Sequence, residues 1–167
     1  IGALGAAARG FVDYLADARV GAWQLLPVTP PGLGASPYSS LSAFAGNPLL
    51  IDLEGLAAAG WLPWETLAAA PAFPAERVDS PAVTAYKTAM LRRAFDGFQA
   101  ALPPDYAAFC TAHAGWLDDY ALFMAARAAH GDALWTAWEP PLARREPAAL
   151  AAWRARLADE IAFHRFV

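Results

Sequence analysis

The residues best suited to chemistry lie in a stretch without formal charge, residues 28–51, which contains no Asp, Glu, Lys, Arg or His. It supplies hydroxyl groups, a side-chain amide and aromatic faces, contributed by Ser36, Tyr38, Ser39, Ser40, Ser42, Phe44 and Asn47. Such groups suit a neutral polyhydroxy ligand, which is held by hydrogen bonds and ring stacking rather than by ion pairs. The alternative is structural: Tyr38 and Phe44 anchor the loop to the core, and spacing alone favours this second interpretation.

Paired carboxylates for glycoside chemistry are the next possibility, because the chain has 16 acidic residues. That chemistry needs two carboxyl groups roughly 5–9.5 Å apart, flanking the bond. The closest acidic residues stand one or two positions apart on predicted helices, which places their side chains on different faces. These are Asp118-Asp119, Asp159-Glu160, and Asp52 with Glu54. Capping and solvation explain them better, so we predict no catalytic residue in this chain.

Metal, nucleophile and nucleotide motifs are missing from the sequence. The histidines, at positions 113, 130 and 164, share no metal-ligand spacing. Gly34-Ala35-Ser36 opens like a hydrolase nucleophile elbow, but Tyr38 replaces its closing glycine. The glycines at 32 and 34 open no predicted helix, which argues against a phosphate-binding loop. We therefore predict no metal and no cofactor.

Composition and charge exclude several classes of partner. The net charge is −4 and the 12 Lys and Arg residues form no basic run, so nucleic acid is not an expected partner. No segment has the ~18 uninterrupted apolar residues of a membrane span, so we expect no membrane association. The one cysteine, Cys110, cannot form an internal disulfide, which favours a reducing compartment and a cytoplasmic location.

The elements that must position the loop are mostly helical. Hydrophobic spacing predicts a helix over 4–19, and the short apolar segment WQLLPV at 23–28 predicts a strand buried on both faces. Two further helices are expected with capping residues: 52–60 with Asp52 as N-cap, and 80–102 with Ser80 as N-cap. A short helix is expected to begin near residue 63, and others to cover 104–112, 115–129 and 147–163. Residues 130–147 are expected to form a loop. A single strand would leave the backbone groups on both of its edges unpaired. Either the prediction of a strand is wrong, or the chain is part of a larger protein that supplies the neighbouring strands.

Residues 36–53 read SPYSSLSAFAGNPLLIDL, and this segment resembles the signature of the 4-alpha-glucanotransferases, the amylomaltases or disproportionating enzymes of glycoside hydrolase family 77. The segments FVDYL at 11–15 and WQLLPV at 23–28 are similar to that family's first barrel helix and strand. IGALG at 1–5 is similar to the segment that leads into this helix. The resemblance is continuous over residues 1–62, whereas from 63 onwards only the order of helices and scattered aromatic residues agree.

The resemblance implies an α/β fold, in which residues 1–62 begin a (β/α)8 TIM barrel with a substrate loop at 28–51. Residues 63–167 would be a mostly α-helical insertion leading back to the barrel. The implied activity is transfer of 1,4-alpha-glucan segments between maltooligosaccharides or to glucose, by a retaining mechanism with an Asp nucleophile and a Glu acid/base. Those catalytic motifs are expected beyond residue 167, so the fragment alone should be inactive.

The polar members of the matching motif, Ser36, Tyr38 and Asn47, are implied to bind substrate. The implied partners are a maltooligosaccharide or glucan substrate, a glucose acceptor and the remainder of its own barrel. Leu33 and Ala35 depart from the pattern, since the family often has an aromatic residue and an Asp in this turn. A secondary glucan site that needs this aromatic residue is not expected. The alternative function is a catalytically inert helical scaffold or carbohydrate-binding module that has kept the sugar loop.

Overall fold

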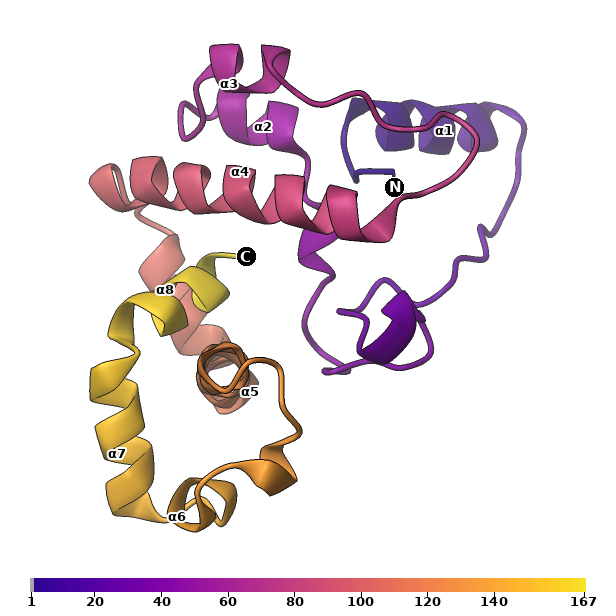
Figure 1. Ribbon diagram of the computed structural model, residues 1–167. Helices are drawn as coiled ribbons and strands as arrows, with labels where there is room; N and C mark the ends of the chain where they lie inside the picture. Colours follow the sequence, from indigo (N-terminus) through magenta and orange to yellow (C-terminus); the bar gives the residue numbers. More distant parts are fainter. Residues whose placement is uncertain (1) are drawn as a thin grey trace. The chain divides into compact units, whose positions relative to one another are not determined.

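The structure, a computed structural model, describes residues 2–167 apart from the side chain of Leu33. Ile1, which begins the predicted lead-in segment, lies outside the described residues. The chain forms two compact units, Ile1–Leu102 and Pro103–Val167, and each is described by itself. Both are built from helices and irregular connections (Figure 1). None of the helices in the described part combines the length and hydropathy that a membrane-spanning helix needs.

Unit 1 begins with helix α1, Ala6–Asp17, within the range that the apolar spacing predicted. The helix buries none of its residues, and its ring contact to the following segment is edge-on, between Phe11 and Trp23, with centroids 5.0 Å apart. Just before α1, the backbone N–H of Leu4 donates to the carbonyl of Leu50 at 2.8 Å. This bond ties the start of the unit to the far end of the charge-free loop.

Residues 23–28 do not form the predicted buried strand. The segment is not helical and belongs to no sheet, although the carbonyl of Val28 at its end accepts a backbone hydrogen bond from Asn47, and no β-strand occurs between residues 2 and 167. Its apolar side chains, including Trp23, Leu25 and Val28, are exposed, and Leu26 is 60% exposed. The physical reason is that a strand needs a neighbour to pair with its N–H and C=O groups, and the described chain offers none.

The core of unit 1 lies along helix α4, Ser80–Ala100, which packs against helix α2, Leu53–Ala58. Helix α3, Trp64–Ala68, packs on α2, and Figure 1 shows both short helices on the same side of α4. Between residues 53 and 98 the buried side chains are Leu53, Ala57, Leu62, Val83, Lys87, Met90, Leu91, Ala94, Phe95 and Phe98. Apolar spacing predicts a buried stripe of Tyr86, Met90, Leu91, Phe95, Phe98 and Leu102; the middle four are buried, Tyr86 is half-buried, and Leu102 lies beyond the helix and is exposed.

The N-cap of α4 is Asp79 rather than the predicted Ser80. Asp79 Oδ1 accepts a hydrogen bond from the backbone N–H of Ala82 at 3.1 Å, and Ser80 already belongs to the first turn. A carboxylate at this position also interacts favourably with the positive end of the helix dipole. At α2, Asp52 is the N-cap residue as predicted, but its side chain makes no capping hydrogen bond.

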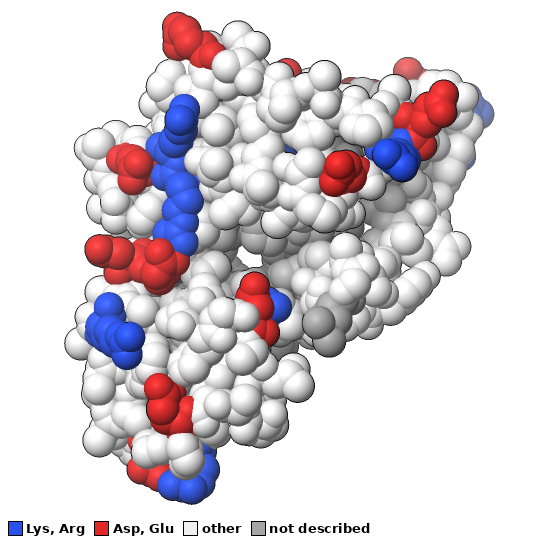
Figure 2. All heavy atoms as spheres, in the orientation of Figure 1, with Lys and Arg blue, Asp and Glu red and all other residues white. Residues whose placement is uncertain are grey.

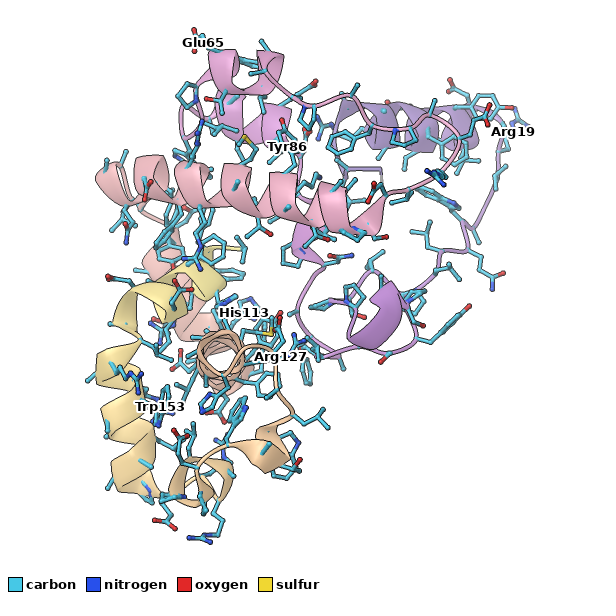
Figure 3. All side chains as sticks on the ribbon, viewed as in Figure 1. Arg19, Glu65, Tyr86, His113, Arg127 and Trp153 are labelled. Atoms are coloured by element: carbon cyan, nitrogen blue, oxygen red, sulfur yellow. The ribbon has the colours of Figure 1, made fainter. Side chains whose placement is uncertain are left out.

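Unit 2 contains α5, Tyr106–Ala129; a 3₁₀ turn, Trp135–Ala137; α6, Pro140–Ala143; α7, Pro147–Arg156; and α8, Ala158–Phe166. The most extensive packing is between α5 and α8. Ala121 and Ala125 of α5 are completely buried against Ile161 of α8, because their small side chains let the two backbones approach closely. Trp153 projects from α7 toward this core (Figure 3).

Three predicted boundaries in unit 2 are wrong. α5 is one helix where two were expected, and Gly115 lies in its interior, where a glycine costs only about 1 kcal/mol relative to alanine. The last predicted helix is instead two, because Leu157, with φ −110° and ψ 26°, leaves the helical region between α7 and α8. The predicted loop at 130–147 contains α6 and a 3₁₀ turn.

Candidate functional site

The charge-free loop, residues 28–51, is closed on itself by backbone hydrogen bonds. From base to tip these are Asn47 N to Val28 O at 2.8 Å, Leu41 N to Pro30 O at 3.1 Å, and Gly32 N to Ser39 O. An isolated antiparallel bridge joins Pro31 to Ser40 within this ladder. The loop is therefore an irregular hairpin, with residues 33–38 at its tip.

The tip turns through two successive residues with left-handed backbone, Gly34 at φ 71° and Ala35 at φ 55°. Glycine adopts this region freely, whereas for an L-residue such as alanine it costs roughly 1–2 kcal/mol. After the turn, Ser36 Oγ accepts a hydrogen bond from the backbone N–H of Tyr38 at 3.3 Å. The predicted site residue Ser36 therefore fixes the backbone that carries the predicted site residue Tyr38.

The aromatic rings of the loop face solvent. Tyr38 is 77% exposed and Phe44 is 74% exposed. The structural interpretation, in which both rings anchor the loop in the core, is therefore wrong. An exposed phenol ring offers both a flat apolar face and a hydroxyl group, the combination that binds a sugar ring by stacking and hydrogen bonding.

Two of the loop serines hold its shape. Ser42 Oγ accepts hydrogen bonds from the backbone N–H groups of Phe44 and Ala45, both at 3.1 Å. Ser40 Oγ lies 2.6 Å from the carbonyl oxygen of Ser42 and 3.1 Å from that of Pro30, to which it can donate. These hydroxyl groups, which the sequence offered as ligand contacts, are engaged by the loop backbone.

Asn47 lies at the base of the loop, away from the tip that carries Ser36 and Tyr38. Its Oδ1 accepts a hydrogen bond from the backbone N–H of Leu49 at 3.0 Å and so caps the 3₁₀ turn Pro48–Leu50. The side-chain NH₂ group keeps its donors available, because Oδ1 alone serves the cap. The structure thus brings Ser36 and Tyr38 together at the tip of the loop. The contacts of Asn47 are instead at the base of the loop.

Lys87 is the residue of this region that sequence reasoning missed. Its Nζ donates hydrogen bonds to the carbonyl oxygens of Leu49, at 2.7 Å, and Ile51, at 2.8 Å. Burial lowers the pKa of Lys87, and the negative charge of Asp52 partly opposes this effect. A signal was present in the sequence: Lys87 follows Val83 by four positions and precedes Met90 by three, which puts it on the buried face of α4.

The adjacent acidic residues of unit 2 are occupied by ion pairs. Asp118 pairs with Arg165 at 2.8 Å, and Asp119 pairs with Arg145 at 2.6 Å and with Arg154 at 3.5 Å. On the face shown in Figure 2, acidic and basic side chains are scattered over a largely uncharged surface. No three His, Cys, Asp or Glu residues lie close enough to bind a metal ion within residues 2–167.

His130 is held by four neighbours in unit 2. Its ring stacks on Trp138, with centroids 4.9 Å apart, and lies 5.0 Å from the ring of Trp153. Nδ1 is 2.7 Å from the carbonyl oxygen of Ala126, and Nε2 is 2.8 Å from Glu139 Oε2. Burial lowers the pKa of His130, but the hydrogen bonds to these two acceptors and the charge of Glu139 outweigh burial and raise it.

Unit 2 also has a half-open cavity of about 340 Å³. Its walls are mainly apolar, including Phe123, Trp135 and Trp138, and its charged members Asp119 and Arg145 are paired with each other. None of the three predicted site residues lies there. The loop in unit 1 therefore remains the candidate site.

Comparison with known proteins gives one consistent result. The family described as 4-alpha-glucanotransferase matches residues 1–167. The 4-alpha-glucanotransferase of Synechocystis sp. is 46% identical over 171 residues, which is 100% of this chain and 34% of that protein. The enzyme of the same name from Thermus thermophilus is 46% identical over 170 residues, covering 99% of this chain and 33% of that protein.

The structural comparison agrees with the sequence comparison. The amylomaltase from Streptococcus agalactiae in complex with acarbose has a TM-score of 0.91 at 30% identity, over 98% of this chain and 34% of that structure. The chain therefore spans about a third of the length of the relatives that it matches. These matches extend over both units and include the loop with Ser36, Tyr38 and Asn47, and the chain belongs to the 4-alpha-glucanotransferase family.

Proposed function

We propose that the full-length protein transfers 1,4-alpha-glucan segments between maltooligosaccharides or to glucose. Family membership supports this activity, as does the similarity to an amylomaltase whose structure is a complex with acarbose. The observation that carries the proposal within this chain is the charge-free loop with its exposed Tyr38 ring. A neutral polyhydroxy substrate needs such a surface, because it offers hydroxyl groups and apolar ring faces but no charge.

In the proposed reaction, this chain binds substrate and the rest of the protein performs the chemistry. Ser36, Tyr38 and Asn47 bind the glucan, while the Asp nucleophile and the Glu acid/base of a retaining double displacement lie outside this chain. The engagement of Asp118 and Asp119 in ion pairs supports this division, since a catalytic pair needs two carboxyl groups that face one bond. No cofactor takes part in such a displacement.

We also infer that residues 1–62 begin a (β/α)8 barrel and that residues 63–167 form the helical insertion. The non-helical segment 23–28 supports this inference, since it is mostly apolar and belongs to no sheet. Both features are expected of a barrel strand whose neighbouring strands are missing. The remaining barrel strands would pair with it and cover its side chains. A cytoplasmic location is inferred from the single cysteine, Cys110.

The experiment that tests this function is an assay of the full-length protein with maltotriose. Transfer produces glucose together with maltooligosaccharides longer than the substrate, and both are resolved by chromatography. Retention of the alpha configuration in the products, followed by NMR, tests the double displacement. Absence of both glucose and longer products would contradict the proposed function.

The matched control is the 167-residue chain alone, assayed at the same concentration. We expect no transfer, because the catalytic carboxyl groups are proposed to lie elsewhere. Transfer by the isolated chain would refute that placement while leaving the activity itself established.

A further inference from the structure

Lys87 is the only charged side chain that is buried in the described part of the chain, with 8% of its surface exposed. Placing an ammonium group in the interior costs free energy unless hydrogen-bond acceptors surround it. An apolar side chain of similar length would fill the same space on α4 without this cost. The cation therefore needs an explanation beyond packing.

The acceptors of Lys87 are two carbonyl groups at the C-terminal end of the charge-free loop. Leu49 and Ile51 belong to an irregular segment, in which a 3₁₀ turn passes into extended backbone, so regular secondary structure does not satisfy their carbonyl oxygens. Nζ binds both, at 2.7 and 2.8 Å. A single ammonium group with three donors can hold two acceptors at once from a helix 36–38 residues away in sequence.

The carbonyl between these two is held from another element. Leu50 O accepts the hydrogen bond from Leu4 N at 2.8 Å, just before the start of α1. The next side chain, Asp52, contributes negative charge near Lys87 and packs against Gly5, where any side chain would collide with its carboxylate. The end of the loop is thus fixed on one side by α4 and on the other by the segment before α1.

A short chain of contacts connects Lys87 to the proposed substrate loop. Lys87 holds the carbonyl of Leu49, and the N–H of the same residue donates to Asn47 Oδ1 at 3.0 Å. The backbone N–H of Asn47 in turn donates to Val28 O at 2.8 Å and closes the base of the hairpin. A displacement at Leu49 is therefore passed to both the side chain and the backbone of Asn47.

We propose that Lys87 is a positioning residue for substrate binding, which clamps the end of the loop to α4 and so fixes Asn47 and the hairpin above it. Lys87 does not touch the glucan; it acts through the backbone of residues 49–51. This inference rests on the proposed function. It adds a residue of the helical part, residues 63–167, to the set that determines how the loop binds substrate.

The test uses Lys87→Met in the full-length protein, which keeps the apolar length but removes the donors and the charge. We expect KM for maltotriose to rise about tenfold while kcat changes less than about threefold, the pattern of lost ground-state binding. Amide hydrogen exchange in residues 39–51 should accelerate in the variant without substrate. Lys87→Arg retains a cation with several donors and should keep KM within about threefold of the wild-type value.

Phe98→Leu is the matched control, because Phe98 is also buried on α4 but packs against Trp61, with ring centroids 5.1 Å apart. It should lower the thermal midpoint and leave both KM and loop exchange unchanged. An unchanged KM in Lys87→Met, or an equal rise in Phe98→Leu, would overturn the positioning role. Should Lys87→Met fail to fold, Lys87→Gln replaces it, because its neutral amide ends one bond short of Nζ and should also raise KM.

The two proposals fail in different ways. An inactive wild-type protein refutes the proposed function, and loop exchange in Lys87→Met then still decides whether Lys87 clamps the loop. An active wild-type protein whose Lys87 variants keep the normal KM refutes the positioning role alone.

Discussion

Tyr38 and Asn47 belong to the same loop but have different surroundings, and this difference decides what a substitution would do. The Tyr38 side chain is 77% exposed, whereas Asn47 uses Oδ1 to cap a turn. A change at Asn47 therefore alters both the loop and any ligand contact. Tyr38 allows the ligand contact to be tested with little disturbance of the fold.

We expect Tyr38→Ala in the full-length protein to lower kcat/KM for maltotriose about tenfold, because a stacking face worth about 1.4 kcal/mol is removed. Tyr38→Phe keeps the face and should lose less. Steady-state kinetics check both values, and the thermal midpoint should stay at the wild-type value. The matched control is Trp64→Ala, which removes an exposed aromatic side chain on α3 and should leave kcat/KM unchanged. Unchanged kinetics in Tyr38→Ala would show that Tyr38 does not belong to the site.

The contacts of His130 predict that the packing of unit 2 depends on pH. Both ring nitrogens face acceptors, Ala126 O and Glu139 Oε2, so the doubly protonated ring satisfies both contacts and its pKa is raised in the folded state. Burial opposes this rise, as does the charge of Arg156, whose guanidinium lies over the ring of Trp153. The stabilisation is complete below the unfolded-state pKa of about 6.5 and is lost as pH rises through the higher folded-state value.

We therefore expect amide exchange in residues 130–143 of the full-length protein to increase as pH rises above about 6.5, after correction for intrinsic rates. His130→Gln removes the titrating group and should abolish this added dependence. Glu139→Gln removes the charged acceptor and should reduce it. The same pH dependence in wild type and His130→Gln would show that another group is responsible.

At the scale of the elements, two glycines inside helices have opposite surroundings. A Cβ atom added at Gly97 of α4 would collide with the backbone of Trp61, whereas one added at Gly115 of α5 would meet open space. Gly97 is therefore required for the close approach of α4 to the segment after α2. Gly115 is tolerated in α5 because the packing of that helix against α8 compensates for its low helix propensity.

We expect Gly97→Ala to destabilise the protein by about 1–3 kcal/mol through overpacking. Its matched control, Gly115→Ala, should stabilise by about 0.5–1 kcal/mol, since it only adds helix propensity. Thermal unfolding of the full-length variants measures both effects. Equal changes in the two variants would mean that the contact of Gly97 with Trp61 does not limit the packing.

At the scale of the whole molecule, the apolar segment 23–28 is exposed and lacks the neighbouring strands that its composition calls for. Isolated hydrophobic side chains on a surface are ordinary, but Trp23, Leu25, Leu26 and Val28 are exposed together on one segment that belongs to no sheet. Unpaired backbone next to apolar side chains favours association with other strands. The proposed barrel supplies such strands within one protein.

The 167-residue chain by itself should therefore self-associate and bind a hydrophobic dye such as ANS, whereas the full-length protein should do neither. Light scattering coupled to size-exclusion chromatography checks the association. Leu26→Lys in the isolated chain should reduce both association and dye binding. A monodisperse isolated chain with a sharp unfolding transition would instead favour the independent helical module.

The sequence by itself determined the features that depend on neighbouring residues. These features are the charge-free loop, the family motif around Tyr38 and the apolar stripe of α4. They could be predicted because proline, glycine and apolar spacing act over a few positions. The same local rules left the helix boundaries around Gly115 and Leu157 wrong. There, packing between α5, α7 and α8 decides which backbone conformation is kept.

Only the tertiary structure decided which groups meet across the chain. It exposed the rings of Tyr38 and Phe44 and placed Asn47 at the loop base. It also brought Lys87 to carbonyl groups 36–38 positions earlier in the sequence. The predicted strand at 23–28 shows the reason most clearly. Its apolar composition is local, but a strand exists only where a second segment takes its backbone hydrogen bonds, and that depends on the fold around it.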